Sequence, residues 1–317
     1  MKILKNELHV VFGASGNSGS AIIRELVRRK FNVRGINRSG KANVPEEVEI
    51  IKADIFDEEA SKLAIEGATV IYNCINIPYS KWVDDYNSLT KKFIDLVSNS
   101  NAKIIIIDNL YMYGSNYNEP LREDMESLAQ TKKGRVRAEI ASLYLQAHKE
   151  GRINVVICRA SDFYGPGVLN SQMGERVMPN VLQGKKVTML FNLDAMHTFT
   201  FIDDYAKSVV SLTDHDEAFG QVWHIPAAEP ITQREFLNIA FEEANKSPKI
   251  SSLSGKMFTL MTVFIPILKE IKELSYQFER PFIMEYSKYE NKFGLNVTPH
   301  REAIRSTLDW YSKNYSK

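Results

Sequence analysis

Three glycines, at positions 13, 16 and 19, separate a short apolar run from an amphipathic stretch near the start of the chain. Leu8–Phe12 predicts a strand and Ser18–Lys30 a helix, so the glycines lie in the turn between them. Glycine permits a tight turn, lets a pyrophosphate approach the backbone, and lets helix and strand pack closely. The helix amino terminus adds N–H groups and a positive dipole end. A plain glycine-rich turn is the alternative, but this context predicts dinucleotide binding by Gly13, Ser15, Gly16, Asn17 and Gly19.

The rest of the first half alternates strand and helix patterns. Further strands are predicted at Val33–Asn37, Val48–Ala53, Val70–Cys74, Lys103–Ile107 and Val155–Cys158, and further helices at Glu58–Ile65, Asp84–Ser98 and Thr131–Lys149. Strict alternation implies right-handed crossovers and a parallel sheet covered on both faces. We therefore predict an α/β fold with a doubly wound parallel Rossmann sheet.

The alternation ends after Asp162, which indicates a second, smaller lobe. We expect residues 1–162 to form the dinucleotide-binding domain and residues 163–317 a substrate lobe, with residues 199–225 returning to the Rossmann core. Asp203 or Asp204 is expected to cap a helix over Tyr205–Leu212.

The composition excludes several classes of protein. A formal net charge of +1 argues against a dedicated nucleic-acid binder. Cys74 and Cys158 are too few for a disulfide framework and suit a reducing cytosol. The apolar run Met257–Leu268 is shorter than the about 20 residues needed to span a bilayer, and the six histidines show no metal-ligand spacing. We expect a cytoplasmic protein without membrane, nucleic-acid or metal partners.

The choice of coenzyme depends on the end of the second predicted strand. A carboxylate there would bind the ribose hydroxyls and repel a 2′-phosphate, but this chain has Asn37 and Arg38. A guanidinium suits a phosphate, so NADP is favoured over NAD, although Arg38 could instead be a solvated surface charge. Asp54 is expected near the adenine, and Asn73 and Cys74 leave the fourth strand where the coenzyme should pass.

Four further segments resemble the short-chain dehydrogenase/reductase superfamily, in particular its extended branch of NAD-dependent epimerases and dehydratases. They are Tyr111–Gly114, Arg159–Gly167, Phe199–Asp204 and the tail around Gly294, Pro299, Ala303 and Trp310. With the glycine turn, they extend the resemblance over nearly the whole chain. The resemblance implies the Rossmann fold and a nicotinamide coenzyme.

The resemblance also implies a catalytic Tyr, a Lys four residues later on the same helix face, and an upstream Ser. With Glu139 setting the register of this helix, the Tyr and Lys positions fall on Thr131 and Arg135. Counting back from Gly114 places the Ser position on Asn109. No tyrosine in the chain is followed by lysine four residues later, so the usual dyad is missing. Arg135 could bind the ribose hydroxyls, and Asn109 could hydrogen-bond a carbonyl. The candidate acid is Tyr111 or Tyr79, and the alternative is that these two side chains serve only in core or rim packing.

The remaining basic and polar candidates are weaker signals. Lys132, Lys133, Arg135 and Arg137 predict a solvated helix face or a coenzyme contact. The resemblance places Tyr164 and His197 at the substrate, with His197 where nucleotide-sugar enzymes commonly carry a diphosphate-binding Arg.

Together these features predict an atypical NAD(P)-dependent oxidoreductase or epimerase-like enzyme that transfers hydride to or from a small carbonyl or alcohol. It is expected to bind a small-molecule substrate and could be a homodimer. One alternative is a catalytically silent NADP(H)-binding redox sensor. A second is a nucleotide-sugar epimerase or dehydratase, which matches the fold but fits the residues at the catalytic positions poorly.

Overall fold

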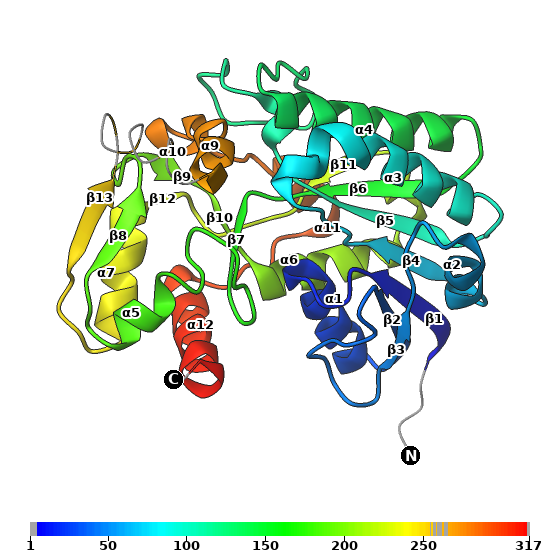
Figure 1. Ribbon diagram of the computed structural model, residues 1–317, viewed down its shortest axis with the longest axis horizontal. Coiled ribbons are helices and arrows are strands. Elements are labelled where there is room, and N and C mark those ends of the chain that lie inside the picture. Colours follow the sequence, from blue (N-terminus) through cyan, green and yellow to red (C-terminus); the bar gives the residue numbers. More distant parts are fainter. Residues whose placement is uncertain (1–4, 254, 256–257, 259–261, 263–265, 316–317) are drawn as a thin grey trace. The chain divides into compact units, whose positions relative to one another are not determined.

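The computed structural model describes residues 5–253, 255, 258, 262 and 266–315. The chain forms two compact units (Figure 1). Unit 1 is made of Met1–Met112, Lys132–Arg159 and Ala206–Ile225, and unit 2 of Tyr113–Thr131, Ala160–Tyr205 and Pro226–Lys317. The division into functional lobes at residue 162 stays a prediction.

Unit 1 contains a 7-stranded sheet in the order β11-β6-β5-β4-β1-β2-β3, and every pairing is parallel. Its strands are β1 (Lys5–Phe12), β2 (Phe31–Asn37), β3 (Glu49–Lys52), β4 (Val70–Asn73), β5 (Lys103–Asp108), β6 (Asn154–Arg159) and β11 (Val222–His224). The order reverses between β1 and β4, which is the topological switch point of a doubly wound sheet. The predicted Rossmann fold is therefore confirmed.

Helices cover both faces of this sheet (Figure 1). Val10 and Phe12 belong to an apolar cluster with residues of α2, α3 and α4, while Val11 between them is equally buried on the opposite face. On that face Ile23 of α1 packs against the backbone of Gly35. The helices and short 3₁₀ turns of unit 1 are α1 (Asn17–Arg28), α2 (Glu58–Ile65), η1 (Tyr79–Lys81), α3 (Trp82–Val97), η2 (Tyr111–Tyr113), α4 (Lys132–Lys149), η3 (Leu212–Asp214) and η4 (Asp216–Ala218).

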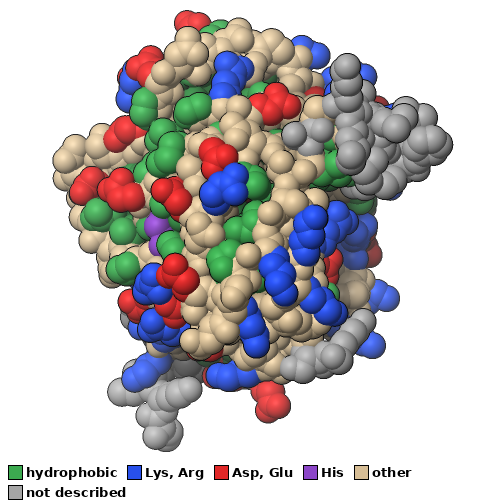
Figure 2. Space-filling view, turned by 90° about the vertical axis from the view of Figure 1, so that its left-hand side faces the viewer, with side chains coloured by type: hydrophobic (Ala, Val, Ile, Leu, Met, Phe, Trp, Pro, Cys, Tyr) green, Lys and Arg blue, Asp and Glu red, His purple; other side chains and the backbone are tan. Residues whose placement is uncertain are grey.

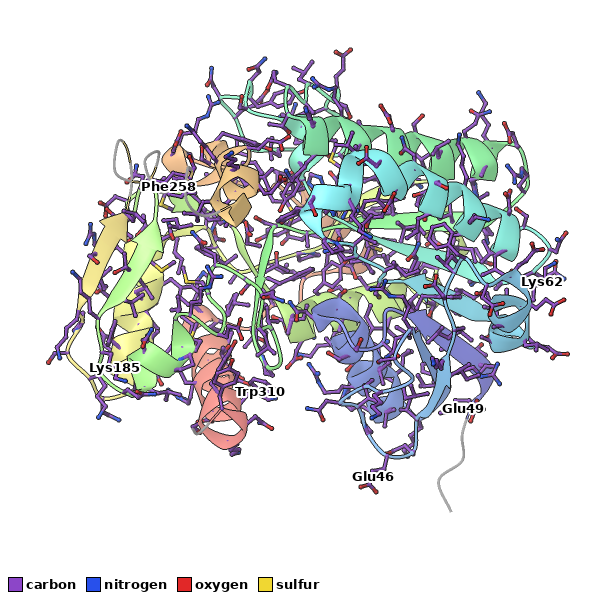
Figure 3. The ribbon with its side chains drawn as sticks, viewed as in Figure 1. Glu46, Glu49, Lys62, Lys185, Phe258 and Trp310 are labelled. Atoms are coloured by element: carbon purple, nitrogen blue, oxygen red, sulfur yellow. The ribbon has the colours of Figure 1, made fainter. Side chains whose placement is uncertain are left out.

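Among its described residues, unit 2 is built from helices and three strand pairs. β7 (Asp162–Tyr164) pairs with β10 (Phe199–Phe201), β9 (Met196–His197) with β12 (Ile231–Thr232), and β8 (Val187–Leu190) with β13 (Ile250–Leu253). Its helices are α5 (Met178–Leu182), α7 (Gln233–Glu243), α9 (Pro266–Lys272), α10 (Tyr276–Glu279), α11 (Ser287–Phe293) and α12 (His300–Asn314), which carries Trp310 (Figure 3). A hydrophobic core of aliphatic and aromatic side chains, including Tyr164, Phe236 and Tyr311, holds the unit together.

Helix α6 (Ile202–Ser211) corrects one expectation. It begins directly after β10, three residues before the predicted start, so Asp203 and Asp204 lie in its first turn and are not its cap. Carboxylates in a first turn still interact favourably with the helix dipole. The Asp204 carboxylate also accepts hydrogen bonds from the backbone N–H and hydroxyl of Thr298.

Most of the apolar run 257–268 lies outside the described residues. Within the described part of the chain, no helix is both long and apolar enough to cross a membrane. On the face seen in Figure 2, acidic and basic side chains are both present, in keeping with the net charge of +1.

Candidate functional site

The glycine turn lies at the switch point of the sheet, where β1 and β4 end. The backbone N–H groups of Gly13 and Ala14 both donate to the Ile36 carbonyl, which ties the turn to β2. Gly13 has a φ of +76°, and a Cβ there would come within 2.5 Å of the Cys74 carbonyl oxygen. A Cβ on Gly19 would clash with the Gly13 backbone. These two glycines are therefore required by the packing of the turn itself.

Gly16 differs from the other two glycines because it is exposed to solvent and is enclosed far less tightly by the backbone. It is exposed, with φ −80° and ψ 168°, and a Cβ there would meet only the Gly13 carbonyl oxygen, at 3.2 Å. Gly16 precedes α1, which has no side-chain cap, so the amides of the first turn keep their hydrogen-bonding capacity. Ser15 beside it is also exposed, and Asn17 begins the helix. This arrangement fits a pyrophosphate bound by backbone amides.

The loop after β2 is organised by Asn37. Its side-chain oxygen accepts hydrogen bonds from the Gly40 N–H at 2.7 Å and the Ser39 hydroxyl at 3.0 Å, and its amide donates to the Lys41 carbonyl at 2.8 Å. Arg38 is exposed on this loop, so its guanidinium is accessible to an anion. After β3, the Asp54 carboxylate accepts from the Phe56 N–H and forms a local turn.

Asn73 and Cys74, at the end of β4, are both buried. The Asn73 side chain accepts from the Ile75 N–H and donates to the Tyr144 hydroxyl at 2.9 Å, so it holds the strand end in place. Burial raises the pKa of the Cys74 thiol to about 12, although a hydrogen bond with Ser18 opposes this. Cys74 is therefore a neutral thiol behind the glycine turn.

Two tyrosines come together beyond the ends of β4 and β5. The hydroxyls of Tyr79 and Tyr111 lie 3.0 Å apart, and both side chains are partly exposed. Asn109 accepts a hydrogen bond from the Tyr111 N–H with its side-chain oxygen, at 3.0 Å. The structure thus brings together the two candidate acids and the residue at the expected Ser position.

The start of α4 is only partly the solvated face expected from the sequence. Lys132 and Arg135 are exposed, as expected, but Lys133 and Arg137 are 2% and 6% exposed. Thr131 is the residue immediately before the helix and is partly buried. The solvated-face interpretation is therefore wrong for Lys133 and Arg137, which are four residues apart and share one helix face.

Arg137 belongs to a buried charge cluster that the sequence analysis did not identify. Its Nη1 lies 3.4 Å from one oxygen of Asp108, and the Arg159 Nε lies 3.2 Å from the other. The Arg137 guanidinium is also 4.3 Å from the Trp82 ring centroid and 4.7 Å from that of Tyr86, and its Nε has no hydrogen-bond partner among the described residues. Burial alone would lower the pKa of Arg137, but Tyr86 and Asp108 raise it overall.

The two expected substrate residues are both buried in unit 2. His197 is 1% exposed, and its ring nitrogens face acceptor oxygens of Asp162 at 2.9 Å and Gln277 at 3.1 Å. Tyr164 lies in the hydrophobic core of unit 2, where burial raises the pKa of its phenol. Contact of either side chain with a substrate stays a prediction. Among the described residues, no three His, Cys, Asp or Glu side chains cluster in a way that could hold a metal ion.

The parallel sheet, its strand order and the glycine turn at the switch point define an α/β protein of the Rossmann type. The sequence matches the NAD dependent epimerase/dehydratase family over residues 9–225. The chain therefore belongs to this family, as its motifs indicated.

Solved structures with low sequence identity share the fold. UDP-glucuronic acid 4-epimerase from Bacillus cereus, in complex with NAD, aligns with a TM-score of 0.79 at 18% identity over 98% of this chain and 100% of that chain. dTDP-glucose 4,6-dehydratase from Bacillus anthracis str. Ames, also in complex with NAD, gives 0.80 at 16% identity over 97% of each chain. An uncharacterized protein, y4nG, of Sinorhizobium fredii (strain NBRC 101917 / NGR234) is 23% identical over 99% of this chain and 80% of its own length.

Proposed function

We propose that this chain binds a nicotinamide dinucleotide at the carboxyl edge of the unit 1 sheet and uses it to oxidise or reduce a small alcohol or carbonyl substrate. The observation that carries the proposal is the contrast within the glycine turn. Gly13 and Gly19 are closed in by the backbone, whereas Gly16 is open to solvent beside an uncapped helix. When bound, the nicotinamide supplies a hydride acceptor or donor.

The coenzyme would extend from the glycine turn toward the ends of β2 and β4. The proposed binding residues are Gly13, Ser15, Gly16, Asn17, Gly19, Asn37, Arg38, Asp54, Asn73 and Cys74. Asn37, Asn73 and Asp54 would act mainly by shaping the surrounding loops, because the structure uses their side chains for local hydrogen bonds. Exposed Arg38 supports NADP, while the solved structures named above carry NAD.

The proton in this reaction would pass through the phenol pair of Tyr79 and Tyr111. Thr131 has no acidic group to replace a phenol, and Arg135 stays charged, so neither expected dyad position can exchange a proton at neutral pH. The two phenols lie beyond adjacent strands at the edge where the coenzyme is proposed to bind. Asn109 would orient the substrate oxygen, and Arg135 would bind the hydroxyls of the nicotinamide ribose.

A second candidate function is epimerisation or dehydration of a nucleotide sugar. It is supported by the family and by the activities of the structural relatives. His197 occupies the position where those enzymes commonly carry a diphosphate-binding arginine. It is buried and bonded to Asp162, which argues against a nucleotide-sugar substrate.

Calorimetry with NADP⁺, NADPH, NAD⁺ and NADH tests the binding proposal, and absence of binding by all four would refute it. Purified protein is then mixed with NADPH or NADP⁺ and a panel of aldehydes, ketones, alcohols and nucleotide sugars. Coenzyme absorbance reports net redox turnover, and chromatography of the sugars reports epimerisation, in which the coenzyme is regenerated. Tight binding without turnover would favour a redox sensor over an enzyme.

A further inference from the structure

A buried ammonium group lies over the ring of Tyr79, one member of the phenol pair. Lys133, in the first turn of α4, is 2% exposed, and its Nζ lies 5.5 Å from the centroid of the Tyr79 ring. The Tyr79 hydroxyl in turn lies 3.0 Å from that of Tyr111. Burying an ammonium costs on the order of several kcal/mol, and its contact with the electron-rich Tyr79 ring offsets part of that cost.

The other charged groups of this region lie on three different elements. Arg137, one helical turn after Lys133 on α4, interacts electrostatically with both Tyr79 and Tyr111. The negative group is Asp108 of β5, whose two oxygens are bound by Arg137 and by Arg159 of β6. On α3, neutral Tyr86 and Trp82 pack against the Arg137 guanidinium. Two cations of α4 therefore act on the phenols, and the carboxylate is occupied by guanidinium groups.

We propose that Lys133 is a positioning residue that favours the ionised form of the Tyr79–Tyr111 pair, replacing the lysine of the missing dyad. A cation favours a neighbouring phenolate whichever element carries it, so the usual spacing on one helix is not essential. In the family pattern the phenol and the cation share a helix. Here the cation comes from α4, and the phenols come from the segments that follow β4 and β5.

This inference rests on the proposed function and gives the proton of that reaction a route. In the oxidative direction the phenolate oxygen of the nearer tyrosine would accept the hydroxyl proton of the substrate alcohol. The coenzyme, when bound, would supply the hydride acceptor, so that a carbonyl is left. The second phenol donates a hydrogen bond to that phenolate before the transfer. In the reductive direction the same proton returns to the substrate oxygen.

The test is an NMR titration of protein labelled with ¹³Cζ-tyrosine, in which Tyr79→Phe and Tyr111→Phe assign the two signals. Lys133→Met keeps the length of the side chain and removes its charge. It is expected to raise the titration midpoint of the pair by roughly one unit or more, and Lys133→Arg is expected to restore it. Lys132→Met, which makes the same charge change at an exposed neighbour, serves as the matched control. Lys133→Gln replaces the Met variant if that variant does not fold.

An unchanged midpoint in Lys133→Met, or an equal shift in Lys132→Met, would overturn the inference. The titration needs neither substrate nor coenzyme, and NADPH and NADH binding are measured on the same samples. Normal coenzyme binding without a Lys133 effect removes this inference alone. A Lys133 effect without any coenzyme binding overturns the proposed function.

Discussion

The Cα of Gly13 lies against the carbonyl group of Cys74, so close that a Cβ would approach the carbonyl oxygen to 2.5 Å. This contact joins the end of β1 to the end of β4, the two strands between which the order of the sheet reverses. The turn that is proposed to hold the pyrophosphate is therefore part of the central packing of unit 1. Substitutions at the three glycines can separate stability from coenzyme binding.

Gly13→Ala is expected to destabilise the protein by about 2–4 kcal/mol. The new methyl group would clash with the Cys74 carbonyl, and the φ of +76° is unfavourable for alanine. Urea denaturation measures the loss. Wild-type stability in this variant would mean that the β1 and β4 ends separate easily.

Gly16→Ala is expected to change the free energy of unfolding by less than about 1 kcal/mol, because its φ of −80° suits alanine and the Gly13 carbonyl oxygen, 3.2 Å from the new Cβ, needs to move only slightly. The same methyl group would occupy the open side of the turn. Coenzyme affinity should fall roughly 10- to 100-fold, in line with the loss of one or two charge-assisted hydrogen bonds. Calorimetry with NADPH checks this, and undiminished affinity would place the pyrophosphate elsewhere.

The glycine turn and the parallel sheet could be predicted because their signals are local. Each strand is a short apolar run, and the glycine spacing is read within seven residues. The sequence predicts the start of α6 three residues too late because Ile202 follows directly on the apolar residues of β10. A boundary between two directly adjoining elements leaves no turn residue to mark it.

The burial of Lys133 and Arg137 could not be predicted in the same way. It depends on Tyr79, Trp82 and Asp108, which come from three other elements that are distant in the sequence. The one available signal was the four-residue spacing of the two basic residues, which places them on a single face. Taken alone, that spacing does not tell a solvated face from a buried one.

Arg38→Asp is expected to weaken NADPH binding roughly 10- to 100-fold relative to NADH, since a carboxylate would replace the proposed 2′-phosphate partner. Lys41→Asp, at an exposed position on the same loop, makes the same charge change without the proposed contact. Calorimetry with both reduced coenzymes compares the two variants. Equal losses for NADPH and NADH in Arg38→Asp would refute the phosphate contact.

Asp108→Asn is expected to destabilise the protein by about 3–5 kcal/mol, because two buried guanidinium groups would lose the charge they share. Asp95→Asn removes an exposed partner of Arg152 and should have no measurable effect. Urea denaturation of both variants gives the comparison. If Asp108→Asn were as stable as the wild type, the buried cluster would contribute specificity without net stability.

The ionisation of Glu25 is expected to make the stability of unit 1 depend on pH. Burial would raise the pKa of its carboxyl, but hydrogen bonds from Arg28 and Arg29 lower it below the ordinary value of 4.5. A carboxyl with a lowered pKa stabilises the folded state fully above its unfolded value, and this contribution is lost as the pH falls through the folded value. Glu25→Gln should therefore cost about 1–2 kcal/mol at neutral pH and progressively less below pH 4.5.

Urea denaturation of wild type and Glu25→Gln at neutral and acidic pH measures this difference. Glu58→Gln is the matched control, because Glu58 pairs with Lys62 by the same i,i+4 spacing but with both side chains exposed. Figure 3 labels Lys62 on α2. It should cost less than about 1 kcal/mol at neutral pH, since exposed pairs are screened by solvent and Glu58 contributes only the small dipole interaction of a first-turn carboxylate. A Glu25→Gln effect of equal size at both pH values would show that the loss arises from packing and not from the carboxylate charge.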